Sequence, residues 1–136
     1  MNKKLIQVKN LHTYFYTEAG IVKAVNNVSF DIYEGEVLGI VGESGSGKSV
    51  TSLSINRLIP SPPGEIVSGK IIYNDTNLLE LSHLEMRKYR GRDIAMIFQE
   101  PMTSLNPVMK IKNQMNEILI RHYEISEEEA TKKSIK

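Results

Sequence analysis

The segment GESGSGKS, residues 42–49, gathers three glycines and three serines around one lysine. It fits G-x-x-x-x-G-K-[ST] at every fixed position. A loop that wraps a triphosphate turns successive amide N–H groups inward, and this requires backbone angles that glycine adopts readily. Lys48 supplies a point charge for the outer phosphates, and the Ser49 hydroxyl can ligate Mg²⁺, which prefers oxygen ligands. These residues predict a site for a nucleoside triphosphate with Mg²⁺; the alternative is a flexible Gly/Ser turn with a solvated lysine.

The segments on either side of this loop are those that a phosphate-binding loop requires. VLGIV, residues 37–41, is wholly apolar, which predicts a strand buried on both faces in a parallel sheet. KSVTSLSINRLI, residues 48–59, has apolar residues near helical spacing and precedes the proline group 60–64, which predicts a helix and its end. The N-terminus of that helix would add unpaired N–H groups and a positive dipole end to the site.

Four further segments are expected to be strands. Residues 5–16 are rich in β-branched and aromatic side chains, and residues 21–33 alternate apolar with polar, as a half-buried antiparallel strand does. Residues 64–74 predict another strand. Residues 92–98, RDIAMIF, predict a second buried strand.

Helices are expected in the second half of the chain. Ser82 and Glu85 have capping-box spacing at the start of a short helix over 82–91. Asn106 followed by Pro107 predicts the N-cap and first turn of an amphipathic helix over 107–122. Ser126 and Glu129 form a second capping box, which begins a further helix. The apolar face of helix 107–122 is expected to pack in the core; the alternative is a dedicated partner-binding surface. This face comprises Ile111, Met115, Ile118, Leu119 and His122.

The composition excludes several kinds of function. The 136 residues suit one domain, with 40% apolar and 24% charged residues, and the net charge of +1 gives no reason to expect nucleic acid as a partner. The absence of cysteine excludes disulfides, thiolate metal sites and cysteine nucleophiles. No apolar run approaches the ~20 residues of a membrane-spanning helix, so a cytoplasmic location is expected.

A second group of residues with possible chemistry is IAMIFQEPMTSLNPV, residues 94–108. Gln99 would end a buried strand there, where it reads as an exposed polar residue. Its amide oxygen could equally reach a metal ion or an attacking water. The residues alone leave both interpretations open.

With these segments the sequence resembles the ATP-binding subunits of ABC transporters, in particular the oligopeptide and dipeptide importer group, which includes nickel importers. The resemblance covers essentially the whole chain and is most specific over residues 24–58 and 91–109. It implies an α/β fold of the P-loop NTPase (ABC ATPase) type, as the N-terminal part with a mixed sheet, an antiparallel β subdomain and the start of a helical subdomain. Residues 1–100 would form the nucleotide-binding core, and residues 101–136 would continue from the Q-loop into the helical subdomain.

The resemblance also implies roles for individual residues. Residues 42–49 correspond to the Walker A loop, and Gln99 corresponds to the Q-loop glutamine that touches Mg²⁺ together with Ser49. Phe15 aligns best with the aromatic residue that stacks on adenine, although Tyr14 and Tyr16 are close rivals and each can instead be a packed strand aromatic. The residues expected to contact ATP around the loop are Gly42, Glu43, Ser44, Gly45, Ser46, Gly47, Lys48, Ser49 and Val50.

The implied function is that of an ATP-binding, energy-coupling subunit of an importer for peptides or similar solutes, peripheral on the inner face of the cell membrane. Its partners would be a permease, contacted through the loop Glu100–Pro107, and a second ATP-binding subunit arranged head to tail. Two alternatives are a non-catalytic nucleotide-binding fragment and another P-loop NTPase or kinase.

The family's LSGGQ-type signature, its Walker B strand with the catalytic glutamate, and its switch histidine do not occur in these 136 residues. The sequence therefore looks like the N-terminal part of a longer subunit. We expect the chain alone to bind nucleotide without hydrolysing it, because hydrolysis needs a carboxylate to orient the water. We also expect the apolar segment 37–41 to be left as an exposed edge, which favours poor solubility or dimerisation.

Overall fold

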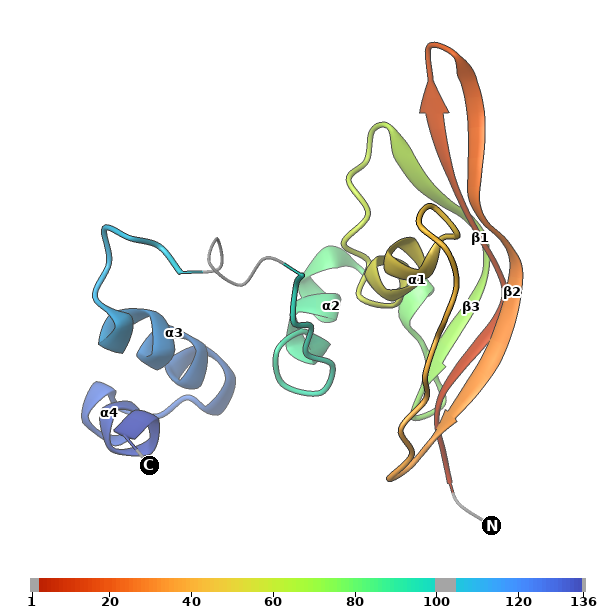
Figure 1. The fold of residues 1–136 in the computed structure, drawn as a ribbon. Coiled ribbons are helices and arrows are strands. Elements are labelled where there is room, and N and C mark those ends of the chain that lie inside the picture. Colours follow the sequence, from red (N-terminus) through yellow and green to blue (C-terminus); the bar gives the residue numbers. More distant parts are fainter. Residues whose placement is uncertain (1–2, 100–104, 136) are drawn as a thin grey trace. The chain divides into compact units, whose positions relative to one another are not determined.

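The computed structural model describes residues 3–99 and 105–135. The chain divides into two compact units, Met1–His83 and Leu84–Lys136. The N-terminal unit contains a sheet with one helix against it, and the C-terminal unit contains helices (Figure 1).

The N-terminal unit is built on a four-stranded antiparallel sheet with the strand order β2-β1-β3-β4 (Figure 1). The predicted strands 5–16, 21–33 and 64–74 are confirmed within one or two residues. The strands are β1 (Lys4–Thr17), β2 (Gly20–Tyr33), β3 (Gly64–Tyr73) and β4 (Thr76–Asn77), and the 3₁₀ turn η1 (Leu78–Glu80) follows. The central strand β1 supplies most of the buried apolar side chains, because it is paired on both edges and covered on one face. The buried apolar residues of the sheet are Ile6, Val8, Leu11, Val25 and Ile71.

Helix α1 (Lys48–Ile55) lies against the face of this sheet (Figure 1). It ends four residues before the predicted end at residue 59. The reason is Arg57, whose φ of 52° is left-handed, so that the Leu58 amide bonds to the Leu53 carbonyl at 2.8 Å. The Arg57 guanidinium donates to the Leu78 carbonyl oxygen at 3.1 Å, which fixes this end of the helix on η1.

The predicted buried strands 37–41 and 92–98 are not formed. Residues 37–41 belong to no strand, and Val37 and Val41 are 97% and 94% exposed. Within 92–98 there is only one isolated bridge, between Arg90 and Ile94. A strand of a parallel sheet needs neighbours on its edges to satisfy its backbone groups. Among residues 3–99 and 105–135, none supplies such a neighbour to either segment, so apolar composition alone did not make a strand.

The exposed segment 37–41 leads to a prediction about self-association. The chain is expected to elute as a dimer or larger species, because an uncovered apolar segment associates with others of its kind. Val41→Lys is expected to shift it toward the monomer, as measured by size-exclusion chromatography with light scattering. Ile135→Lys, which adds the same charge at an 81% exposed position of another element, is the matched control. An equal shift in both variants would contradict a specific role for 37–41.

The C-terminal unit contains α3 (Ile111–Tyr123) and α4 (Glu127–Ile135), while α2 (His83–Tyr89) spans the boundary and matches the predicted helix 82–91. The predicted start of α3 at Asn106–Pro107 was wrong, because its N-cap is Lys110. The Asn106 side-chain oxygen accepts instead from the Val108 amide at 3.1 Å, in a local turn. Asparagine favours such turns as readily as helix caps, and here Asn106 forms the turn.

The predicted apolar face of this helix is not packed in a core. Ile111 and Ile118 are 60% and 56% exposed. The side chain packed between α3 and α4 is Asn116, which is 3% exposed and whose Nδ2 donates to Thr131 Oγ1 at 2.8 Å. Its Oδ1 accepts from the Ser134 hydroxyl at 3.1 Å. The buried residues of this helix pair are therefore the polar Asn116 of α3 and Ala130 of α4, and the expectation of core packing was wrong for the apolar face of α3.

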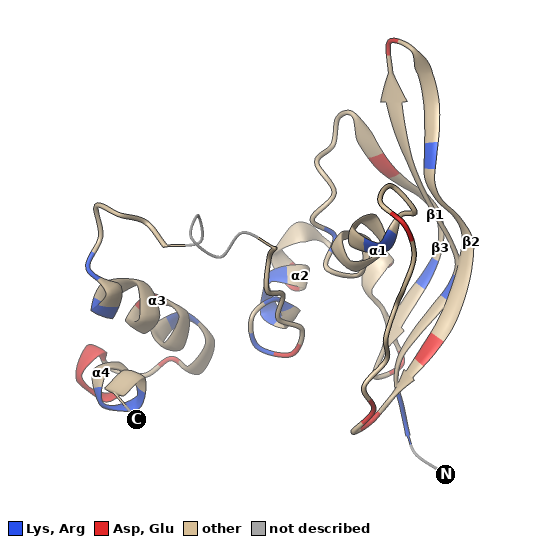
Figure 2. Ribbon diagram, in the orientation of Figure 1, with Lys and Arg blue, Asp and Glu red and all other residues tan. Residues whose placement is uncertain are grey.

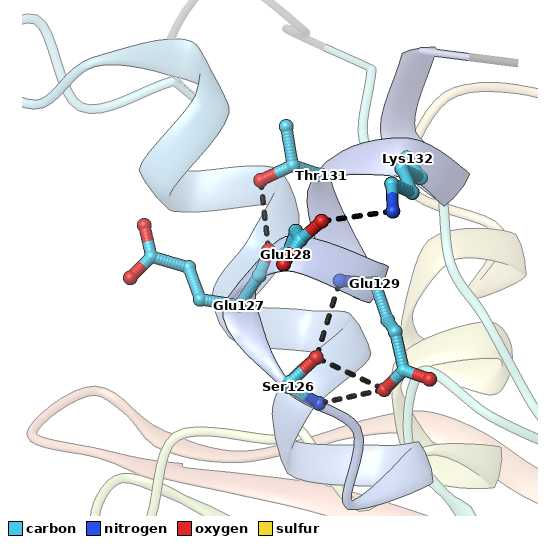
Figure 3. A network of polar contacts seen from close by, with 6 residues as sticks. All are labelled: Ser126, Glu127, Glu128, Glu129, Thr131 and Lys132. Atoms are coloured by element: carbon cyan, nitrogen blue, oxygen red, sulfur yellow. Dashed lines mark hydrogen bonds and ion pairs between the residues drawn. The ribbon is translucent and has the colours of Figure 1, made fainter.

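The predicted capping box at the start of α4 is confirmed (Figure 3). The Ser126 amide and hydroxyl donate to Glu129 Oε2 at 3.1 and 3.0 Å, and the Ser126 hydroxyl oxygen accepts from the Glu129 amide at 3.3 Å. The first turn carries glutamates and the last turn lysines, which suits the helix dipole (Figure 2). The backbone hydrogen bond from Ser126, followed by its hydroxyl bond, lowers the pKa of Glu129.

The capping box leads to a prediction about acid pH. A carboxylate whose folded-state pKa is lowered stabilises α4 above its unfolded pKa, and this is lost as the pH falls through the folded value. In Ser126→Ala, which keeps the amide but removes the hydroxyl, the Glu129 pKa is expected to move part of the way back. Carboxyl ¹³C titration by NMR measures this, with Ser126→Thr as the hydroxyl-retaining control. An unchanged Glu129 pKa in Ser126→Ala would show that the Ser126 hydroxyl does not contribute to the lowered pKa.

Candidate functional site

The glycine-rich loop leads directly into the first turn of α1. Gly45 and Gly47 have left-handed φ values of 80° and 89°, and Gly47 is the N-cap residue of the helix. No side chain caps this end. The first-turn amides of α1 therefore keep their N–H groups for a ligand, and the helix dipole favours an anion there.

The loop is seated on strand β2. A Cβ at Gly47 would lie 2.2 Å from the carbonyl oxygen of Ala24 and 3.8 Å from Val25 Cγ2, so loop and strand touch through their backbones. The β1–β2 register shifts by one residue between the pairs Thr13–Val25 and Phe15–Val22, beside this contact. The antiparallel sheet thus fixes the position of the glycine-rich loop.

The side chain of Lys48 folds back across the loop. Its Nζ donates to the carbonyl oxygens of Gly42 at 2.7 Å and Glu43 at 2.6 Å, and to Ser46 Oγ at 3.3 Å. These contacts place the ammonium group among the loop residues at the N-terminus of α1. A positive charge beside uncapped amides is an arrangement that fits the outer phosphates of a nucleotide.

The residues predicted to hold Mg²⁺ come from different parts of the chain. Ser49 lies exposed in the first turn of α1. Gln99 is exposed in the other compact unit, at the end of segment 92–98. The predicted permease-facing loop lies partly outside the described residues, from Glu100 to Ser104. Among the residues the structure does describe, no three or more histidine and acidic side chains cluster as a metal site would require.

Phe15 lies on the same face of β1 as α1. Strand residues alternate between faces, so Phe15 shares a face with Thr13, which contacts α1. The Phe15 ring lies over Gly64, where a Cβ would be 2.9 Å from Phe15 Cε1. Tyr14 belongs to the opposite face and its hydroxyl donates to Asn26 Oδ1 at 3.2 Å; Tyr16, also on that face, is 46% exposed. Of the three aromatic candidates, Phe15 is therefore the one on the side of α1.

Three residues that support the loop were missed from the sequence: Ala24, Thr13 and Ser54. The contact of Ala24 is made by its carbonyl oxygen, and a backbone contact leaves no signal in residue type. Thr13 and Ser54 are both 0% exposed and hydrogen-bonded to each other, although they are 41 residues apart. A buried hydroxyl pair of this kind is visible only when strand and helix have been placed together.

Comparison with known proteins agrees with this fold. The family model described as ABC transporter matches residues 25–135, so the chain belongs to the ABC transporter family. It is 50% identical over 132 residues to the oligopeptide transport ATP-binding protein OppD of Bacillus subtilis, covering 97% of this chain and 37% of OppD. It is 49% identical over 130 residues to the dipeptide transport ATP-binding protein DppD of the same organism, covering 96% of this chain and 39% of DppD.

A solved structure agrees as well. The fold matches the dimeric structure of a post-hydrolysis state of the ATP-binding cassette MJ0796 bound to ADP and Pi, with a TM-score of 0.79 and 26% identity over 96% of this chain and 54% of that one. The predicted fold, the N-terminal region of an ABC ATPase, is confirmed. The chain spans about two fifths of the length of the curated relatives named above. Among the residues with a described structure, no helix is long and apolar enough to cross a bilayer.

Proposed function

We propose that this chain is the ATP-binding, energy-coupling part of an ABC importer for peptides or similar solutes. The observation that carries the proposal is the Lys48 ammonium held in a glycine loop at the uncapped N-terminus of α1. Family membership and the similarity to OppD and DppD support the choice of a peptide importer over other P-loop NTPases. The antiparallel strands before the loop argue against a soluble kinase.

In this proposal, each residue of the site has a physical role. The terminal phosphates of ATP take over the contacts that Lys48 makes with Gly42 and Glu43, and the first-turn amides of α1 donate to the phosphate oxygens. Ser49 offers its hydroxyl to Mg²⁺, which would neutralise part of the phosphate charge. Phe15 stacks on adenine, a contact worth about 1–3 kcal/mol.

The proposed partners follow from the family. A second ATP-binding subunit would supply the signature motif that these residues lack, and Gln99 would link the bound Mg²⁺ to the permease through the loop after it. ATP binding would then close the pair of subunits at the inner face of the membrane, and hydrolysis would reopen it.

Within these 136 residues we propose nucleotide binding without turnover. The observation that favours this second function is the sequence itself, which has no Walker B carboxylate to orient the attacking water. Isothermal titration with Mg-ATP, followed by a phosphate-release assay, tests both statements. Saturable binding with no phosphate release is expected. The absence of binding by the folded chain would refute the ATP site. Phosphate release that requires Lys48 would refute the proposal of binding without turnover.

A further inference from the structure

A buried pair of hydroxyls joins strand β1 to helix α1. Thr13 Oγ1 lies 2.8 Å from Ser54 Oγ, and both residues are 0% exposed. The Ser54 hydroxyl donates to the Val50 carbonyl oxygen of its own helix at 2.7 Å. Since Ser54 has one hydroxyl hydrogen, Thr13 is the donor to Ser54. A single directed chain of hydrogen bonds therefore runs from the centre of the sheet into α1.

This pair stands between the two ends of the proposed ATP site. Thr13 pairs across the sheet with Val25, whose side chain lies beside Gly47 of the phosphate loop. Two residues further along β1, on the same face, lies Phe15, the proposed adenine contact. The α1 end of the hydrogen-bond chain belongs to the helix that begins with Lys48.

The bond is directional in a way that apolar packing is not. A buried hydroxyl that loses its partner is costly, so the bond favours one rotation and one height of α1 on β1. The other buried residues of α1 are Thr51 and Ile55, and the Thr51 hydroxyl bonds within the helix, to the Gly47 carbonyl oxygen at 2.9 Å. The bond between Ser54 and Thr13 instead joins α1 to β1 midway between the contacts that hold its two ends. The angle of α1 decides where its first-turn amides and Lys48 lie relative to Phe15.

We infer that Thr13 and Ser54 are positioning residues that set the span between the adenine contact and the phosphate contacts. The inference rests on the proposed ATP site and deepens it. The pair selects a whole nucleotide over its phosphate part alone, because a change in the angle of α1 misplaces the base while the loop still holds phosphates. Neither residue touches the ligand.

The test compares Thr13→Val with wild type for Mg-ATP and for Mg-tripolyphosphate, which has no base. Valine keeps the shape of threonine and leaves Ser54 bonded to Val50. We expect Thr13→Val to weaken ATP binding about fivefold, as a partial loss of the stacking contact with adenine would, and to change tripolyphosphate binding by less than about twofold. Thr13→Ser, which restores the hydroxyl, is expected to recover most of the ATP affinity.

Two further variants separate positioning from general stability. Thr17→Val is the matched control on the same strand, because the Thr17 hydroxyl donates to the Gly20 carbonyl oxygen within the β1–β2 turn, away from α1, and the change should leave both affinities unchanged. In Phe15→Ala the effect of Thr13→Val on ATP is expected to vanish, since the pair acts through the adenine contact. The same fivefold loss in the Phe15→Ala background would overturn the inference.

The outcomes distinguish this inference from the proposed function. Suppose that wild type binds ATP in a Lys48-dependent way. If Thr13→Val then lowers the affinities for ATP and tripolyphosphate equally, or lowers neither affinity, the positioning role is wrong and the ATP site stands. If folded wild type binds neither ligand, the proposed ATP site is wrong and the positioning role falls with it. A fall in melting temperature without a change in the ratio of affinities also overturns the inference.

Discussion

Lys48→Ala is expected to weaken Mg-ATP binding at least about 100-fold. Hydrogen bonds to charged groups are worth about 1.5–3 kcal/mol each, and the Lys48 ammonium is placed to donate more than one to the outer phosphates. Two such bonds correspond to a factor of at least about 100 in the dissociation constant. Isothermal titration calorimetry measures the loss directly.

The fold is expected to be unaffected by this change. The carbonyl groups of Gly42 and Glu43, which Lys48 contacts, belong to exposed residues and can bond to water instead. The free energy of unfolding should stay within about 0.5 kcal/mol of wild type, as for other surface substitutions. Lys70→Ala removes the same charge from an exposed position on β3 and should leave binding unchanged. Equal losses for both lysines would mean that binding follows net charge alone.

Gly47→Ala is expected to destabilise the N-terminal unit by about 3 kcal/mol and to weaken Mg-ATP binding at least about tenfold. A left-handed φ costs a residue with a side chain about 1–2 kcal/mol. The new Cβ would also lie 2.2 Å from the Ala24 carbonyl oxygen, which is backbone and cannot rotate away. Relief of that clash must lift the loop off β2 and move the first turn of α1, so stability and binding fall together.

Gly45→Ala is the matched control for this prediction. Gly45 has a similar φ of 80°, but a Cβ there would meet nothing within 4 Å. Gly45→Ala should therefore lower the free energy of unfolding only by the cost of the left-handed φ, about 1–2 kcal/mol. Chemical denaturation gives both free energies, and titration of the folded proteins gives both affinities. Equal destabilisation by Gly47→Ala and Gly45→Ala would show that the close contact with Ala24 does not contribute to the effect of Gly47→Ala.

The local pattern of residues was enough to predict the antiparallel strands, the capping box of α4 and the need for glycine in the loop 42–49. Strands β1 and β2 alternate and are joined by a short turn, so each finds its partner nearby in the sequence. The capping box needs only Ser126 and Glu129, three residues apart. The glycines at 45 and 47 are required by backbone angles that other residues rarely adopt.

Tertiary structure decided everything that depends on distant partners. The segments 37–41 and 92–98 have the composition of buried strands, yet strand formation depends on neighbours that the described residues do not supply. The apolar side of α3 lies exposed, and the buried residue of α3 is Asn116, whose side chain bonds to Thr131 and Ser134 of α4. The sequence by itself determined the proposal that residues 42–49 hold phosphates. The seat of the loop on Ala24, and the hydroxyl bond from Thr13 to Ser54, exist only because packing brings together backbone and side chains far apart in the chain.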